Sequence, residues 1–172
     1  MVVNLLLSVL FLIVFSFNAI ASESSKKNNS PSNSPPDSPW GHAKEMHVNY
    51  KPHKLLYDLT TDAPEKLDNV LDRASYLFKL YESEMFESSI VIIIHGDAIP
   101  FFAIDQFEKF KQRMYRANSL TVGTTIEFRM CQTAARVMNY QPKDIHGFVK
   151  MVPMADAEIV RLQKEEGYAY MQ

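Results

Sequence analysis

The sequence of 172 residues contains a single cysteine, Cys131. One cysteine cannot close an internal disulfide, and without a Cys-x-x-Cys pair the chain cannot carry out dithiol exchange on its own. The five glycines form neither a Gly-rich phosphate loop nor a dinucleotide-binding fingerprint. A Gly-x-Ser-x-Gly segment is also missing, which excludes the nucleophile elbow of an α/β-hydrolase. What remains is chemistry on one thiol, or none.

An excess of charge of one sign is also absent. The chain has 18 basic and 20 acidic residues and a net charge of -2, and the basic residues are scattered rather than gathered in a stripe. The sequence therefore gives no indication of nucleic-acid binding. With 47% hydrophobic residues, the chain is long enough for one domain with a core of its own and too short for two ordinary domains.

The first 21 residues are typical of a signal peptide. An apolar segment at 5–15 is followed by Ala19-Ile20-Ala21, a small-residue pattern that a signal peptidase could cut before Ser22. We therefore expect a periplasmic or secreted protein, with no stable membrane span after signal removal. An uncleaved anchor is the alternative, because no Lys or Arg precedes the apolar segment.

A Ser-, Asn- and Pro-rich segment at 22–39 lacks apolar residues that could anchor it, and we predict that it is a disordered linker. The folded domain is expected to comprise residues 40–172. Its first part carries His42, His47 and His53. These spacings do not place two imidazoles on one helix face, so no metal site is predicted, although metal binding by these histidines is kept as a minor alternative.

Strand and helix patterns alternate through the domain. Strands are predicted at 54–60, 90–94, 124–130, 148–152 and 168–171, and helices at 62–85, 104–116, 132–138 and 155–166. The first helix is expected to start with Asp62 as its cap and Glu65 in capping-box position. This alternation predicts a single compact α/β domain with a mostly parallel, about five-stranded sheet flanked by helices.

Cys131 lies where a predicted strand turns into a helix. Unpaired N–H groups at a helix start favour an anion, so this position favours a thiolate. A free cysteine is also among the most often buried residues, and an inert, structural role is an equal alternative.

His95 follows the β-branched run at 90–94. The carboxyl ends of parallel strands meet at one edge of the sheet, where ligands and reacting groups collect. If the two strands are neighbours, His95 could stabilise or deprotonate the thiol of Cys131. The alternative is a histidine that caps the end of its strand through local hydrogen bonds.

Several segments resemble the DsrE/DsrF-like family of sulfur-relay proteins. They are Phe128-Arg-Met-Cys131, Val149-Lys-Met-Val-Pro153, Glu158-Ile-Val-Arg-Leu-Gln163 and Gly167-Tyr-Ala-Tyr170, together with Leu55-Leu-Tyr-Asp-Leu59 and Val91-Ile-Ile-Ile-His-Gly96. The resemblance implies an α/β domain with a largely parallel five-stranded sheet and assembly into trimers or hexamers. It also implies that Cys131 corresponds to a cysteine that carries a persulfide in some members.

Together, these features lead to one main functional expectation and one alternative. The first is an exported DsrE-like protein that handles sulfane or reduced sulfur, with Cys131 as persulfide acceptor, His95 as assistant and no cofactor. A sulfur donor or acceptor protein is a potential partner. The alternative is a non-catalytic oligomeric binding or scaffold module in which Cys131 is buried and structural.

Overall fold

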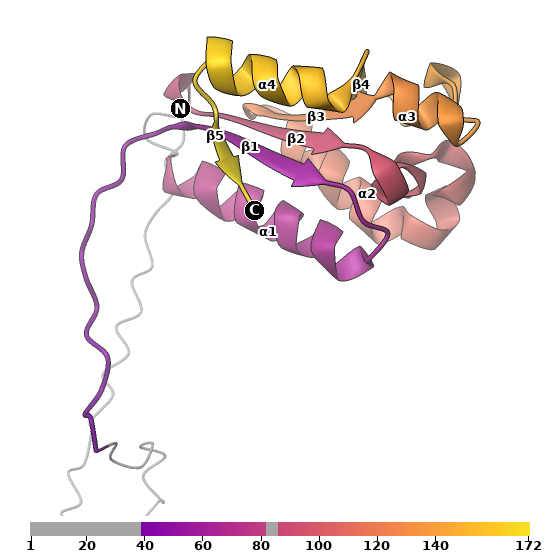
Figure 1. Cartoon of the computed structure of the whole chain (residues 1–172). Helices are drawn as coiled ribbons and strands as arrows, with labels where there is room; N and C mark the ends of the chain where they lie inside the picture. The colour runs from indigo at the N-terminus through magenta and orange to yellow at the C-terminus, as the bar shows by residue number, and fades with distance from the viewer. Residues whose placement is uncertain (1–38, 82–85) are drawn as a thin grey trace, which may run out of the picture. The chain divides into compact units, whose positions relative to one another are not determined.

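The structure is a computed structural model that describes residues 39–81 and 86–172 (Figure 1). Met46–Gln172 forms one compact unit. The predicted signal peptide at 1–21 and the predicted linker at 22–39, apart from its last residue, lie outside the described residues, so both stay predictions. Residues 41–53 are described and have no regular secondary structure.

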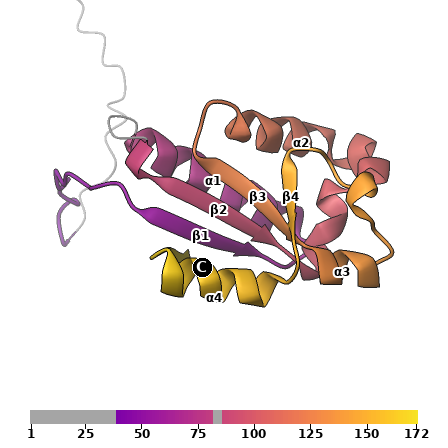
Figure 2. The same ribbon diagram turned by 90° about the horizontal axis from the view of Figure 1, so that it is seen from above.

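Five parallel strands form a single sheet in the order β4-β3-β2-β1-β5. The strands are β1 (Lys54–Leu59), β2 (Ser89–Ile94), β3 (Ile126–Cys131), β4 (Val149–Val152) and β5 (Ala169–Met171). Because all of them run the same way, the carboxyl ends of β1, β2 and β3 meet at one edge (Figures 1 and 2). The predicted fold class, a compact α/β domain with a parallel five-stranded sheet, is confirmed.

Helices cover both faces of the sheet. The helices α1 (Pro64–Leu80) and α2 (Phe107–Thr121) lie on one face and α4 (Ala155–Glu165) lies on the other (Figure 1). Short helical segments η2 (Gly96–Phe102), η3 (Ile104–Gln106), α3 (Gln132–Val137) and η4 (Pro142–Asp144) complete the described elements. No helix in the described part of the chain has the length and hydrophobicity needed to cross a membrane.

Alternating side chains of the central strand β2 enter two separate cores. Ile90, Ile92 and Ile94 belong to the larger core under α1 and α2, whereas Val91 and Ile93 belong to the smaller core under α4. All five are completely buried. This agrees with the prediction from the unbroken β-branched run, which is typical of a strand covered on both faces.

Two details of the first helix differ from the prediction. The cap of α1 is Ala63 rather than Asp62, and no side chain caps the helix. The hydroxyl of Thr61 instead accepts the amide N–H of Ala63, so the predicted capping box is wrong. The helix also ends at Leu80 rather than near residue 85, because the dihedral angles of Tyr81 (φ -98, ψ 10) are no longer those of an α-helix.

The second helix also starts later than predicted. It spans Phe107–Thr121 instead of 104–116, because two 3₁₀ segments occupy the chain from Gly96 to Gln106. The first of these contains Pro100, which has no backbone N–H to contribute to an α-helix. Its buried residues, Phe101 and Phe102 among them, place this segment in the larger core.

Candidate functional site

Cys131 has two structural roles at once. It is the last residue of β3 and the cap of α3, and its Sγ accepts a hydrogen bond from the backbone N–H of Ala134 at 3.4 Å. The predicted strand-to-helix turn at this residue is therefore confirmed. Because α3 has only six residues, this local amide, rather than a long helix dipole, is the group that faces the sulfur. The residue is 5% exposed and belongs to the core under α4.

His95 is hydrogen-bonded to a carboxylate from the neighbouring strand. Its Nε2 lies 2.8 Å from Oδ1 of Asp58, near the end of β1. An ionised carboxylate only accepts, so Nε2 carries the proton and, in the neutral ring, the lone pair is on Nδ1. The two side chains are 25% and 17% exposed. His95 thus pairs across strands rather than through the local hydrogen bonds of the alternative interpretation.

Tyr170 extends this pair to β5. Its hydroxyl donates to Oδ2 of Asp58 at 2.8 Å, so the two carboxylate oxygens have different donors. Partial burial, followed by this hydrogen bond and the charge of Asp58, raises the pKa of Tyr170 to about 12. The phenol therefore stays protonated near neutral pH and holds Asp58 in a fixed orientation.

The strand that His95 directly follows, β2, and the strand that ends in Cys131, β3, are neighbours. The last residues paired between β2 and β3 are Ile94 and Met130, and His95 and Cys131 each come one residue later. His95 has extended dihedral angles (φ -155, ψ -179), so it continues the alternation of β2 and shares the α4 face of Val91 and Ile93. Cys131 lies on that face too.

An ionic cluster holds α4 over this part of the sheet. Arg129, two residues before Cys131 on the same face, donates to Glu158 of α4 at 2.5 Å and to Glu127 at 2.8 Å. Burial would lower the pKa of Arg129, but the hydrogen bonds to these two carboxylates outweigh it and raise the pKa. Arg161 of α4 donates to Glu158 as well. These contacts tie the helix that covers Cys131 to the strand that carries it.

Among the described residues, no three His, Cys, Asp or Glu side chains come close enough together to hold a metal ion. This includes His42, His47 and His53, so the minor metal-binding hypothesis gains no support from the geometry.

Sequence reasoning found Cys131 and His95 but missed Asp58 and Tyr170. One signal for Asp58 was present, because it is the only acidic residue in a strand that is otherwise largely apolar, Lys54-Leu-Leu-Tyr-Asp-Leu59. Its partner could not be identified without the strand order, because 37 positions separate Asp58 from His95. Tyr170 is 112 positions from Asp58 and meets it only because β5 pairs with β1.

The sheet order and the two helical layers define a parallel α/β domain with a candidate thiol site at the carboxyl edge of its strands. No protein-family model matches the chain, and no curated protein shows significant similarity to it. Among solved structures, the chain is similar to MTH1491 from Methanobacterium thermoautotrophicum, described as a protein of unknown function. The TM-score is 0.56 at 18% identity, over 69% of this chain and 97% of that one. At this identity the likeness shows the fold alone.

Proposed function

We propose that the chain is a DsrE-like sulfur carrier in which Cys131 accepts sulfane sulfur as a persulfide. The observation that supports this most is the position of Sγ, at the carboxyl end of β3 against the Ala134 N–H and beside the end of the strand that delivers the His95–Asp58 pair. The resemblance of the sequence around Cys131 to sulfur-relay proteins supports the same function.

The loading step needs no cofactor. The thiolate of Cys131 attacks the terminal sulfane sulfur of an inorganic polysulfide, a new bond forms between Sγ and that sulfur, and the adjacent sulfur–sulfur bond of the donor breaks. The leaving group is a polysulfide dianion one sulfur shorter, so charge and electrons balance without an external oxidant. In the loaded state, the Ala134 N–H can donate a hydrogen bond to the negatively charged persulfide.

In this proposal, His95 is the base that accepts the proton of the Cys131 thiol. With Nε2 held by Asp58, Nδ1 has the lone pair that can take a proton. Asp58 acts as a positioning residue, because it fixes the tautomer and orientation of the ring as second-shell carboxylates commonly do. Tyr170 does the same for Asp58 through its hydroxyl.

The alternative function is a binding or scaffold module with an inert cysteine, and the 5% exposure of Cys131 favours it. The two functions differ in the reactivity of the folded protein. Iodoacetamide at neutral pH should modify wild-type protein under native conditions and leave Cys131→Ser unmodified. A thiol that reacts only after denaturation would leave the alternative as the better account.

The role of His95 is tested by the rate of the same reaction. We expect His95→Gln to slow native alkylation near neutral pH by about tenfold or more, because a positioned base is lost. Asp58→Asn should shift the pH dependence of the rate rather than abolish the reaction. The control is His53→Gln, since His53 is exposed, and urea unfolding of each variant shows whether the fold is intact. Equal rates for His95→Gln and His53→Gln would remove His95 from the mechanism.

Export and assembly are parts of the same proposal. A mature protein that begins at Ser22 would support a periplasmic or secreted location, and mass spectrometry of the protein from its native host tests this. The proposal also includes a homo-oligomer, a trimer or hexamer, which light scattering of the full chain tests. A monomer at working concentrations would contradict that part.

A further inference from the structure

A segment shortly before β1 has the pattern of a strand but belongs to no sheet. Residues 46–51 alternate apolar and polar side chains, Met46-His-Val-Asn-Tyr-Lys51, which is typical of a half-buried strand. Its apolar side chains, Met46, Val48 and Tyr50, are nevertheless 84%, 46% and 61% exposed, and the segment has no regular secondary structure. This segment, the arm, therefore presents an apolar face that the described part of its own chain leaves largely uncovered.

The sheet ends in β4, whose outer edge has no neighbouring strand among the described residues (Figure 2). Such an edge leaves backbone N–H and C=O groups free to pair with an added strand. A charged side chain often protects an edge, but Lys150, the one charged residue of β4, donates to Glu127 of β3. Val149 and Met151 pack in the core under α1 and α2, so the α2 side of this edge is apolar.

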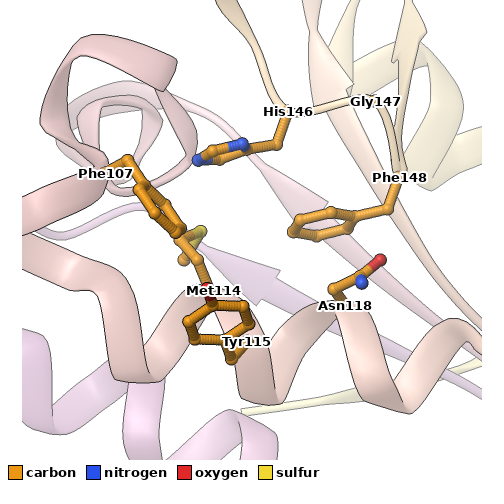
Figure 3. Close-up of a pocket in the computed structure, with 7 residues that line it drawn as sticks. All are labelled: Phe107, Met114, Tyr115, Asn118, His146, Gly147 and Phe148. Carbon is orange, nitrogen blue, oxygen red and sulfur yellow. The ribbon is translucent and has the colours of Figure 1, made fainter.

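A pocket of about 220 Å³ lies next to the start of β4, between α2 and the segment that leads into the strand. Figure 3 shows the aromatic rings of its wall around a common space: Phe107, Tyr115, His146 and Phe148. Tyr115 is 57% exposed, so this side of the pocket is open to groups from outside. An apolar cavity of about 150 Å³ holds benzene, so this space is enough for one aromatic side chain, such as that of Tyr50 in the arm.

The arm cannot reach this edge within its own chain. Only the segment from Tyr50 to Lys54, the first residue of β1, is available as a connection, and it spans at most about 14 Å. A strand added outside β4 would lie four strand spacings from β1, or about 19 Å away. An arm that pairs with β4 therefore comes from a second copy of the chain.

The opposite edge of the sheet, formed by β5, suits the arm less well. The strand β5 has only three residues. The pocket on its α1 side is lined in part by charged and polar side chains, which include Lys66, Asn69 and Arg73. An apolar strand face docked there would take these charges out of water, which costs free energy.

We propose that the arm of one copy adds as a strand to the outer edge of β4 in a second copy, with its apolar side chains on the α2 side and the ring of Tyr50 in the pocket beside Tyr115. In recognition of this kind, main-chain hydrogen bonds supply the affinity and alternate side chains supply the specificity. The inference rests on the homo-oligomer included in the proposed function and names its contact, and it does not depend on the chemistry of Cys131.

The test compares the same charge placed on the two faces of the arm. Tyr50→Asp puts a carboxylate on the apolar face and should raise the dissociation constant of the oligomer by about 30-fold or more, the effect of losing one aromatic anchor. Light scattering of the full chain over a range of concentrations measures this. The matched control is Asn49→Asp, which adds its charge to the polar face and should leave the oligomer intact.

The surface that receives the arm is tested in the same way. Tyr115→Asp, at the open side of the pocket, should dissociate the oligomer as Tyr50→Asp does. Tyr76→Asp on α1, where the tyrosine is 72% exposed, should not. A photo-cross-linker, p-benzoylphenylalanine in place of Lys51, should give covalent dimers with links at 115–118 or 145–152, and a mixture of ¹⁴N- and ¹⁵N-labelled chains shows by mass spectrometry that the links join two copies.

The outcomes separate this contact from the rest of the proposed function. A monomeric wild-type protein would remove both the inference and the proposed homo-oligomer. An oligomer that Tyr50→Asp and Asn49→Asp affect equally, or cross-links to β5 instead of β4, would overturn the strand addition alone. None of these results bears on the sulfur loading of Cys131, which is measured by its own assay.

Discussion

Replacing Gly96 with alanine should destabilise the fold at the point where the His95–Asp58 pair is held. Gly96 follows His95 directly and has φ +57, a left-handed conformation that L-residues rarely adopt. A Cβ at this position would lie 3.0 Å from the carbonyl oxygen of Thr60, which is backbone just beyond β1. The substitution therefore combines two separate costs, one in the dihedral angles and one in contact.

The two costs can be estimated separately. The left-handed conformation costs alanine about 1–2 kcal/mol, and the loss of unfolded-state freedom returns about 0.4–1 kcal/mol. Forcing a methyl group against the Thr60 carbonyl adds about 1–3 kcal/mol, as in other overpacked sites. Gly123 provides a matched control, because it has φ +68 with no atom within 4 Å of an added Cβ, so only the first cost applies.

Urea unfolding of wild type, Gly96→Ala and Gly123→Ala measures these terms. The free energy of unfolding should fall by about 1–3 kcal/mol more in Gly96→Ala than in Gly123→Ala, with equal slopes against urea concentration. If the two variants lose the same stability, the contact between Gly96 and Thr60 does not limit the structure, and the reasoning is refuted. In folded Gly96→Ala, displacement of His95 should also slow native alkylation of Cys131.

Two further predictions concern the core and the ionic cluster. Phe102 is completely buried against the rings of Phe128 and Phe148, so Phe102→Ala should lower the free energy of unfolding by about 3–5 kcal/mol. The control is Phe86→Ala, because Phe86 is exposed. A decrease below about 1 kcal/mol for Phe102→Ala, similar to that of the control, would contradict this packing. The hydrogen bond from Arg161 lowers the pKa of Glu158 below 4.5; burial opposes this effect and the hydrogen bond from Arg129 adds to it. The ionised Glu158 therefore stabilises the folded state at pH values above 4.5, and this contribution is lost as the pH falls through the lowered pKa. Glu158→Gln should therefore reduce stability at pH 7 by about 1.5–3 kcal/mol, because Glu158 and Arg129 are only 11% and 16% exposed and the substitution removes the charge that pairs them. It should also flatten the acid limb of the stability curve, and an unchanged acid limb would show that the pKa is not lowered.

The sequence predicted those parts of the fold that depend on local periodicity. The run at 90–94 indicated a strand buried on both faces, and the change of pattern at Cys131 located the strand-to-helix turn. Both follow from the spacing of apolar residues, which reports the face that each side chain takes. The start of α1 was predicted wrongly, because the hydroxyl of Thr61 rather than the carboxylate of Asp62 accepts a local N–H, that of Ala63, and the helix begins without a side-chain cap.

The candidate site could be predicted only in part, because it is built across strands. Cys131 and His95 each stand at the end of a recognisable strand, but their proximity depends on β2 pairing with β3, which no local pattern specifies. The contacts of Asp58 with His95 and Tyr170 depend in the same way on β1 lying between β2 and β5.

The measurement that tests the central proposal most directly is the intact mass of the mature protein after incubation with polysulfide, with and without a reducing step. The proposal predicts a gain of about one or two sulfur masses on wild-type protein, reversed by reductant and absent in Cys131→Ser, since only a thiolate-competent cysteine loads in this way. An unchanged mass, with Cys131 protected from alkylation until the protein is denatured, would contradict the sulfur-carrier function and leave a structural cysteine.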